Sequence, residues 1–143
     1  MDTDHHGYLL RYTESVWSNE NPEAAMAFFH PDARISGVAG IDDMRPEDMV
    51  TLVQTIFMLV EPPQYRVLHI IADGDRIAYV VACEARSRRT GLPVTFSGQI
   101  SLVLRDGLIV EAHNHFDMIG FFTQLGLLPA DLLETVLAGS VAA

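Results

Sequence analysis

The chain has 143 residues, 49% of them hydrophobic and 20% charged, as in one globular domain with a sizeable core. Its formal net charge is −10 and its longest basic cluster is the short run Arg86-Ser-Arg88-Arg89, which argues against nucleic-acid binding because phosphate contacts need a basic surface. No apolar run approaches the roughly 18 residues that span a membrane, and the N-terminus does not resemble a signal peptide, so we expect one cytoplasmic domain over residues 1–143 with no membrane partner.

Helices are predicted in the first part of the chain. Residues 4–17 carry apolar side chains at spacings of three and four, which gives one apolar stripe. Asn21 and Pro22 have the residue types of a helix cap and first turn, and Pro62-Pro63 stops a later helix. The predicted helices cover residues 4–17, 22–29 and about 46–60, with a short strand over 33–38.

Four strand-like runs follow, over residues 64–72, 76–88, 94–104 and 108–117. Asp73-Gly74 and Asp106-Gly107 supply the positive φ angles of tight hairpins, and Gly98 is the predicted site of a bulge or bend. Short helices are predicted over about 118–125 and 129–137. Helices followed by a long meander predict an α+β fold, in which a curved antiparallel sheet wraps around the N-terminal helices and leaves a conical cavity.

The segment His113-Asn114-His115-Phe116-Asp117 stands out near the end of the last predicted strand. Strand alternation places His113, His115 and Asp117 on one face. The segment that follows, from Met118 to Pro129, is strongly apolar, so we expect Asp117 to lie where the chain turns inward. The sequence therefore predicts a polar site inside an apolar shell.

The order of elements resembles the nuclear transport factor 2-like (cystatin-like) fold, a cone-shaped α+β barrel. The stretch Leu10–Arg34, with its Phe-His-Pro-Asp-Ala step, is similar to the entry helices and first strand of that fold. The stretch Asp106–Gly126, with His115-Phe-Asp117 and a Gln-Leu-Gly tail, is similar to the closing strand of SnoaL-like polyketide cyclases. The fold hosts isomerases, dehydratases, epoxide hydrolases, cyclases and pure binders, so the resemblance predicts the fold more sharply than the activity.

The resemblance implies that Asp117 acts as the general acid/base of an intramolecular aldol closure. A carboxylate inside an apolar pocket can exchange a proton near neutral pH. The alternative is that Asp117 caps the helix over 118–125 through its side chain, and the two roles are compatible. His115 is predicted to act with Asp117, by orienting the carboxylate or a substrate oxygen, or else to be a hydrogen-bonded histidine of the cavity wall.

The resemblance to ketosteroid isomerases, which share the fold, implies that Tyr12 donates a hydrogen bond to a developing oxyanion; core packing is the alternative. The stretch 35–38, where the isomerase base would stand, has no carboxylate, and the Asp-Arg-Asp set of the epoxide hydrolases cannot be assembled. The predicted substrate-binding residues are Tyr12, Trp17, Phe57, His69, His113 and Phe121.

No metal site is predicted, because neighbouring positions on one strand face lie about 7 Å apart and cannot all reach one ion. The leading hypothesis is a cofactor-free enzyme that performs an aldol-type cyclisation or isomerisation on a small apolar or aromatic ligand. The alternatives are a non-catalytic ligand-binding or dimerisation module, and an isomerase or dehydratase of the ketosteroid isomerase type. The strand over 76–88 is apolar on both faces, which predicts a homodimer, and its Cys83 is expected to be a buried small hydrophobe.

Overall fold

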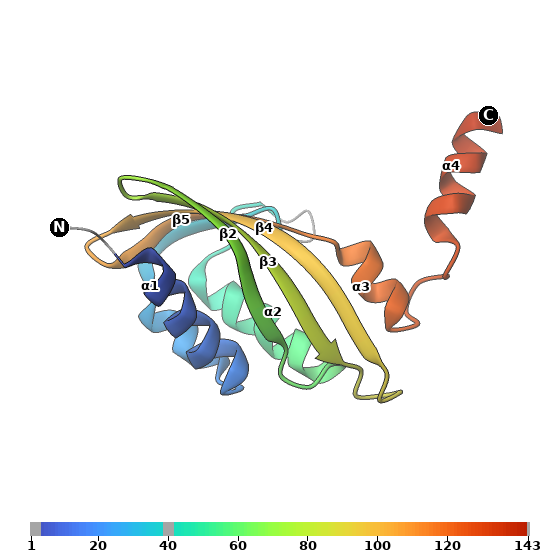
Figure 1. The fold of residues 1–143 in the computed structure, drawn as a ribbon, viewed down its shortest axis with the longest axis horizontal. Coiled ribbons are helices and arrows are strands. Elements are labelled where there is room, and N and C mark those ends of the chain that lie inside the picture. Colours follow the sequence, from blue (N-terminus) through green and yellow to red (C-terminus); the bar gives the residue numbers. More distant parts are fainter. Residues whose placement is uncertain (1–3, 39–41, 143) are drawn as a thin grey trace.

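Five strands form one curved, open sheet whose concave face is covered by helices (Figure 1). The computed structural model describes residues 4–38 and 42–142. The strands are β1 (Phe29–Ser36), β2 (Gln64–Asp73), β3 (Arg76–Arg86), β4 (Pro93–Arg105) and β5 (Leu108–Phe116). The helices are α1 (His5–Tyr12), the π-helix η1 (Thr13–Ser18), the 3₁₀-helix η2 (Pro22–Ala27), α2 (Pro46–Leu59), α3 (Met118–Gln124) and α4 (Leu132–Ala142).

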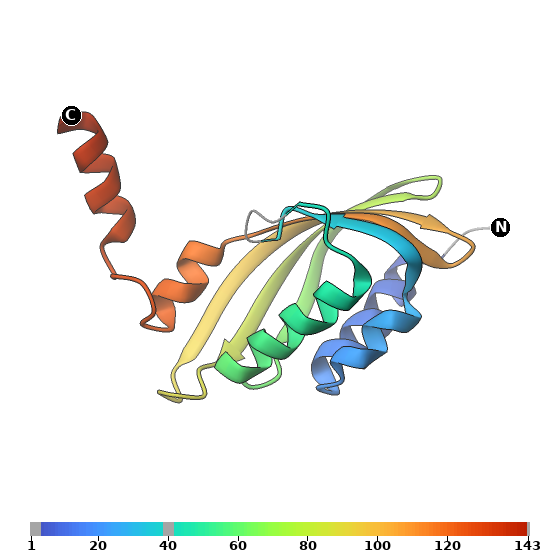
Figure 2. The same ribbon diagram turned by 180° about the vertical axis from the view of Figure 1, so that it is seen from behind.

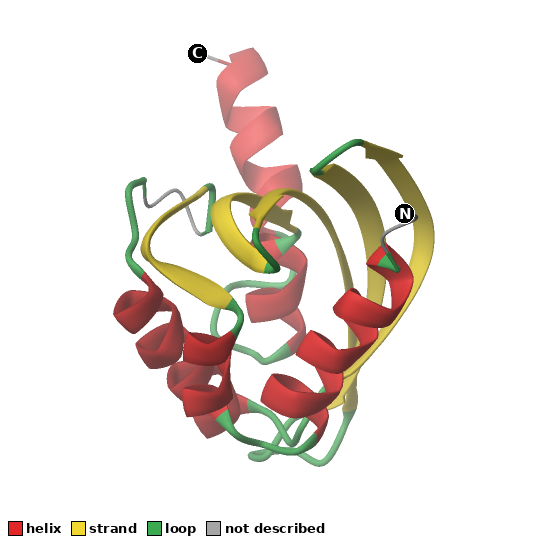
Figure 3. Ribbon diagram, turned by 90° about the vertical axis from the view of Figure 1, so that its left-hand side faces the viewer, coloured by secondary structure: helices red, strands yellow, loops and turns green. Residues whose placement is uncertain are grey.

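The predicted α+β class is confirmed. The strand order is β1-β5-β4-β3-β2, and the four long strands make the predicted antiparallel meander. The first strand differs from the prediction: β1 begins at Phe29 and runs parallel to β5, so the sheet is mixed rather than wholly antiparallel. Figure 3 shows the helices of the first part of the chain gathered on the inner side of this arched sheet.

Gly98 is the predicted site of a bulge or bend, and the bulge is absent, because Gly98 pairs in register with Val81 on β3 and Phe116 on β5. The glycine serves a packing role instead. A Cβ atom there would lie 2.3 Å from the Phe116 ring, so only glycine lets that ring lie over β4. The bulge part of the prediction is wrong because a glycine inside a strand marks either a bulge or a close approach, and only the neighbouring strand decides which.

The main core lies between the concave face and the helices, where side chains such as Leu9, Val16 and Val53 are almost completely buried. A second, smaller cluster under α3 contains Val60, Val94, Phe121 and Leu125. Cys83 is buried on β3, as predicted. No helix within residues 4–38 and 42–142 combines the length and the apolar composition needed to cross a membrane.

The C-terminal helix α4 stands apart from the rest of the fold. Figure 2 shows it extending from the end of α3, clear of the sheet and of the helices that cover the sheet. In Figure 1 it rises on the convex side of the sheet, opposite α1 and α2. The prediction of a last helix is thus confirmed, although it spans 132–142 rather than 129–137.

Candidate functional site

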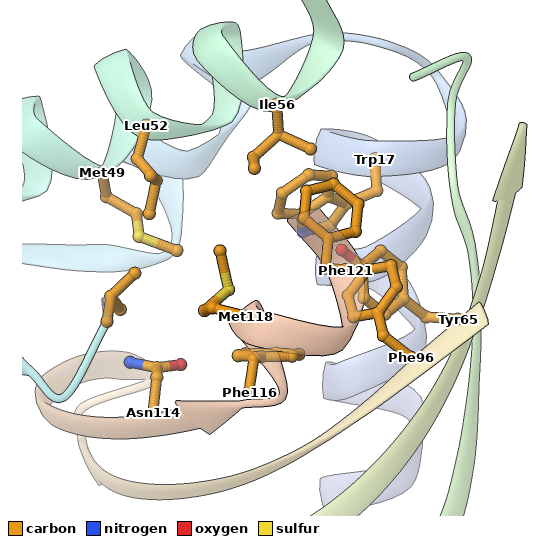
Figure 4. Close-up of a pocket in the computed structure, with 11 residues that line it drawn as sticks. Trp17, Met49, Leu52, Ile56, Tyr65, Phe96, Asn114, Phe116, Met118 and Phe121 are labelled. Carbon is orange, nitrogen blue, oxygen red and sulfur yellow. The ribbon is translucent and has the colours of Figure 1, made fainter. Parts of the chain in front are cut away.

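An apolar pocket lies between α2, α3 and the concave face of the sheet (Figure 4). Its free volume is about 50 Å³. On the same scale, one water molecule needs roughly 10–15 Å³. Eleven residues line it: Trp17, Val38, Met49, Leu52, Ile56, Tyr65, Phe96, Asn114, Phe116, Met118 and Phe121. The pocket therefore collects side chains from η1, α2, β2, β4, β5 and α3, together with Val38.

Aromatic rings form one wall of the pocket. The Trp17 ring lies 5.1 Å from the Tyr65 ring, and the Phe96 ring lies 4.8 Å from the Phe121 ring, measured between centroids. Tyr65 and Phe96 meet edge to face at 6.5 Å, which joins the two pairs into one surface. Such a wall can pack against a flat, ring-containing molecule.

Flexible side chains form the opposite wall. Met49 and Leu52 come from the inner stripe of α2, and Met118 opens α3. Figure 4 shows the Met118 side chain pointing from α3 toward these two residues, into the middle of the pocket. Because methionine has several rotatable bonds and adapts its shape, this wall can move aside for a ligand more easily than the aromatic wall can.

Asn114 is the buried polar residue of the pocket. It is only 7% exposed, and within the described residues its side-chain amide makes no hydrogen bond. At Gly37, where φ is +85°, a Cβ atom would lie 2.3 Å from the Asn114 carbonyl oxygen, so glycine allows the end of β1 to pass close to this residue. The Asn114 amide atoms are not among the fully buried, unpaired polar atoms of the described residues, so they reach the open space of the pocket and can hydrogen-bond a molecule there.

A smaller inner cavity of about 20 Å³ adjoins the pocket, with Met49 and Asn114 lining both. Tyr12 and Tyr79 line this inner cavity. Burial is the main cause that raises the pKa of the Tyr12, Tyr65 and Tyr79 phenols above the ordinary value, and neighbouring phenols add to each rise. These phenols are therefore neutral at physiological pH, and each keeps a proton to donate.

Strand β5 turns a different face to the pocket from the one predicted. Ala112, Asn114 and Phe116 point toward the concave side, whereas His113 and His115 are exposed on the convex side. The prediction that the two histidines line the cavity is wrong. Burying Ala112 and Phe116 is favourable, and because the side-chain period of a strand is two, their burial sends the histidines outward.

Asp117 is exposed and caps α3, and its Oδ1 accepts a hydrogen bond from the Gly120 backbone N–H at 2.9 Å. The expectation that this carboxylate lies inside an apolar shell is wrong, whereas the capping alternative is confirmed. The apolar segment after Asp117 does turn inward, but it does so through Phe121, one turn later. The catalytic role of Asp117 stays a prediction.

The other predicted residues divide between the two faces. Trp17 and Phe121 line the pocket, Tyr12 lines the inner cavity, and Phe57 is buried behind Trp17 with the ring centroids 5.6 Å apart. His69 lies on the convex side, so the prediction that it faces the cavity is wrong.

His113 is held in a short hydrogen-bonded chain on the convex side. Its Nδ1 lies 2.6 Å from the Ser36 hydroxyl and its Nε2 lies 2.7 Å from a Glu111 carboxylate oxygen. The hydrogen bond with His113 is the main cause that lowers the pKa of Glu111. Within the described residues, carboxylate, imidazole and thiol side chains do not gather in a set of three that could hold a metal ion.

Sequence reasoning missed Asn114, although a usable signal was present. Its neighbours two positions away, Ala112 and Phe116, are apolar, and in a half-buried strand the apolar set marks the inner face. The ionisable residues attracted attention because of their chemistry. The amide between them is the one that faces the pocket.

Comparison with known proteins identifies the family and supports the fold. The sequence profile of the SnoaL-like domain matches residues 9–112, most of the chain. The chain belongs to the SnoaL-like family. No curated protein matches it.

Solved structures share the fold of this SnoaL-like domain. AclR from Streptomyces galilaeus is 22% identical, with a TM-score of 0.75, over 87% of this chain and 96% of its own. IdmH from Streptomyces antibioticus, a proposed polyketide cyclase, is 19% identical, with a TM-score of 0.71, over 87% of this chain and 99% of its own. A protein from Catenulispora acidiphila with a ketosteroid isomerase-like fold is 17% identical, with a TM-score of 0.74, over 91% and 98% of the two chains.

The capping role of Asp117 leads to a first prediction. Asp117→Ala should lower the free energy of unfolding by about 1 kcal/mol, because the Gly120 N–H loses its acceptor. Asp117→Asn should change it by only a few tenths of a kcal/mol, because asparagine is an equally good cap. Urea unfolding of the two variants measures the difference. Equal destabilisation by both substitutions would contradict the capping role.

Proposed function

We propose that this SnoaL-like protein binds a small, neutral, ring-containing molecule in the pocket, with an oxygen of the ligand hydrogen-bonded to Asn114. The observation that carries the proposal is the buried Asn114 amide, which lacks a partner among the described residues and faces apolar walls. A ligand oxygen would complete its hydrogen bonding. The aromatic wall of Trp17, Tyr65 and Phe96 favours a flat ligand.

The composition of the pocket supports a neutral ligand. Every described residue that lines it is uncharged, and the raised pKa of Tyr65 keeps its phenol neutral as well. A carboxylate or ammonium group of a ligand would lose its hydration here without gaining an opposite charge. A carbonyl or phenol group would lose much less and could be paired by Asn114.

Proton transfer on such a ligand is the second candidate function, favoured by the similarity to IdmH, which is itself proposed to be a polyketide cyclase. It requires an acid or base within hydrogen-bond reach of the ligand. Asp117, the predicted catalyst, caps α3 from the exposed side. Loss of turnover of a polyketide-type substrate in Asp117→Asn, with stability unchanged, would favour this second function.

A matched pair of ligands tests the binding proposal. The protein should bind 2-naphthol about tenfold more tightly than naphthalene, because only the naphthol offers an oxygen to Asn114. Asn114→Leu, which has a similar volume, should bind both ligands with nearly equal affinity. Isothermal titration calorimetry measures the four affinities.

The control variant for this test is His115→Leu, one residue away on the convex side, which should leave both affinities unchanged. Equal weakening of both ligands in Asn114→Leu would mean that Asn114 shapes the pocket without recognising the oxygen. Failure of the unaltered protein to bind either ligand would contradict the proposal itself.

A further inference from the structure

The inner cavity beside the pocket has room for one oxygen atom. Its free volume is about 20 Å³, and a single water molecule needs roughly 10–15 Å³ on the same scale. Met49 and Asn114 line both the pocket and this cavity, so the two spaces meet at these side chains. An oxygen of a ligand that reaches Asn114 therefore stands at the entrance of the inner cavity.

Tyr79 brings an unpaired hydroxyl group to this cavity. Within residues 4–38 and 42–142 the hydroxyl makes no hydrogen bond, and it is not among the fully enclosed polar atoms, so it reaches open space. Burial raises the pKa of Tyr79 most, and the phenols of Tyr12 and Tyr8 add to the rise. Because those two phenols belong to α1, the Tyr79 phenol lies on the side of β3 that faces the helices.

Tyr12 adds a second donor, next to a π-helix. In η1 the hydrogen bonds join residues five apart, as between the Asn19 N–H and the Glu14 carbonyl oxygen at 2.9 Å, and such turns are rare and frequent at functional sites. Trp17 stands five residues after Tyr12. Burial raises the pKa of Tyr12 most, and a hydrogen bond from the Trp17 side chain acts against that rise. An indole N–H can only donate, so the Tyr12 oxygen is the acceptor, and within the described residues the Tyr12 proton has no acceptor of its own.

The inner cavity thus offers two proton donors to one small space. The other described residues that line it are apolar, apart from Asn114 at the entrance and Tyr8, whose hydroxyl already donates to the Phe28 carbonyl oxygen at 3.0 Å. A carbonyl oxygen has two lone pairs and no hydrogen, so it can accept from both phenols. A hydroxyl group adds a donor that itself needs an acceptor, and a methyl ether adds a carbon atom for which the cavity has no room.

We propose that the inner cavity is the carbonyl subsite of the pocket, in which Tyr79 and Tyr12 donate hydrogen bonds to the oxygen of a ring ketone. Tyr79 then determines the class of ligand, because its unpaired hydroxyl favours a ketone over an alcohol or an ether. This inference rests on the proposed function, since the rings of the same ligand occupy the apolar pocket. It narrows the ligand from a neutral ring molecule with any oxygen to a cyclic ketone.

Tyr79→Phe tests the subsite with two ligands of similar size. 2-Tetralone carries a carbonyl oxygen at the position where 2-naphthol carries a hydroxyl group. The substitution should weaken the binding of 2-tetralone about tenfold and that of 2-naphthol by less than about threefold, as measured by isothermal titration calorimetry. Tyr8→Phe, the same substitution at a hydroxyl that is already paired, is the matched control and should leave the ratio of the two affinities unchanged.

Isotope-edited infrared spectroscopy of bound 2-tetralone tests the subsite in the unaltered protein. Its carbonyl stretch should lie at a lower frequency than in an apolar solvent, because hydrogen bonds from the phenols weaken the C=O bond, and Tyr79→Phe should move it back. A stretch at the apolar-solvent frequency, or equal weakening of both ligands by Tyr79→Phe, would overturn the inference and leave the proposed function standing. Failure of both ligands to bind the unaltered protein would overturn the two together.

Discussion

Raising the pH from about 10 to about 12 is expected to unfold this protein in one cooperative step. Burial raises the pKa of the Tyr12, Tyr65 and Tyr79 phenols, whereas in the unfolded chain each phenol releases its proton near the ordinary value of 10.0. The folded state therefore holds more protons than the unfolded state above pH 10. Stability falls with rising pH wherever the folded state binds more protons than the unfolded state. The contribution of the protonated phenols to the free energy of unfolding is therefore fully present below pH 10 and is lost as the pH rises toward the folded-state pKa values.

The expected loss is large. A phenol that stays protonated in the folded state but ionises in the unfolded state lowers the free energy of unfolding by up to about 1.4 kcal/mol per pH unit. Three such phenols lower it by up to about 4 kcal/mol per pH unit. The total stability of a domain of this size is about 5–15 kcal/mol. The Cys83 thiol acts in the same direction, since burial raises its pKa to about 12. Two pH units can thus remove most of the stability.

Phenolate absorbance and circular dichroism, recorded together during an alkaline titration, measure this effect. Both signals should change at the same pH, because the buried phenols ionise only when the chain unfolds. Tyr79→Phe removes one such group and should shift the transition to higher pH. Phenolate absorbance that appears well before the loss of helical and strand signal would show that the phenols titrate inside the folded protein, contrary to the prediction.

Phe121→Ala should be strongly destabilising, by roughly 3–5 kcal/mol. Phe121 is 1% exposed, and it belongs to the small cluster that attaches α3 to the end of β4. Its ring contacts Phe96 and Phe122, with centroids 4.8 and 5.4 Å away. Truncation removes this buried area and leaves a cavity that the surrounding strands can fill only in part.

Urea unfolding gives the destabilisation, and Phe122→Ala is the matched control. Phe122 is adjacent in sequence but only partly buried, so its truncation should cost less than that of Phe121. Because Phe121 also lines the pocket, the same variant should bind naphthalene-sized ligands with altered affinity if it remains folded. Similar costs for the two truncations would mean that Phe121 does not anchor α3.

The periodic elements of this fold follow from local sequence. The predicted helix over 46–60 is observed over 46–59, and each of the four predicted long strands is observed within two residues of its expected ends. These elements have strong apolar periodicity and clear stop signals, among them Pro62-Pro63 and two Asp-Gly hairpins. The SnoaL-like resemblance, which rests on the order of these elements and on the stretches Leu10–Arg34 and Asp106–Gly126, is confirmed by the family match over residues 9–112.

The wrong predictions for β5 and Gly98 share one physical cause. The local sequence at each of these places is compatible with two structures. The alternation of β5 allows either His113 and His115 or Asn114 and Phe116 to face inward, and Gly98 could mark a bulge or a close approach. The parallel pairing of β1 with β5 joins segments about 80 residues apart in the sequence, so no local pattern announces it.

The sequence by itself therefore determined most of the elements and their order, because hydrophobic periodicity and turn residues act over a few neighbouring positions, and its motifs carried the resemblance to the family. The tertiary structure decided which side of β5 meets the pocket, and with it that Asn114 rather than Asp117 is the inward polar group; the apolar neighbours Ala112 and Phe116 favour that side in the sequence but do not fix it. The reason is that the choice of face depends on the total apolar area buried against α2 and α3. That area comes from residues far apart in the chain, and it exists only once they are packed together.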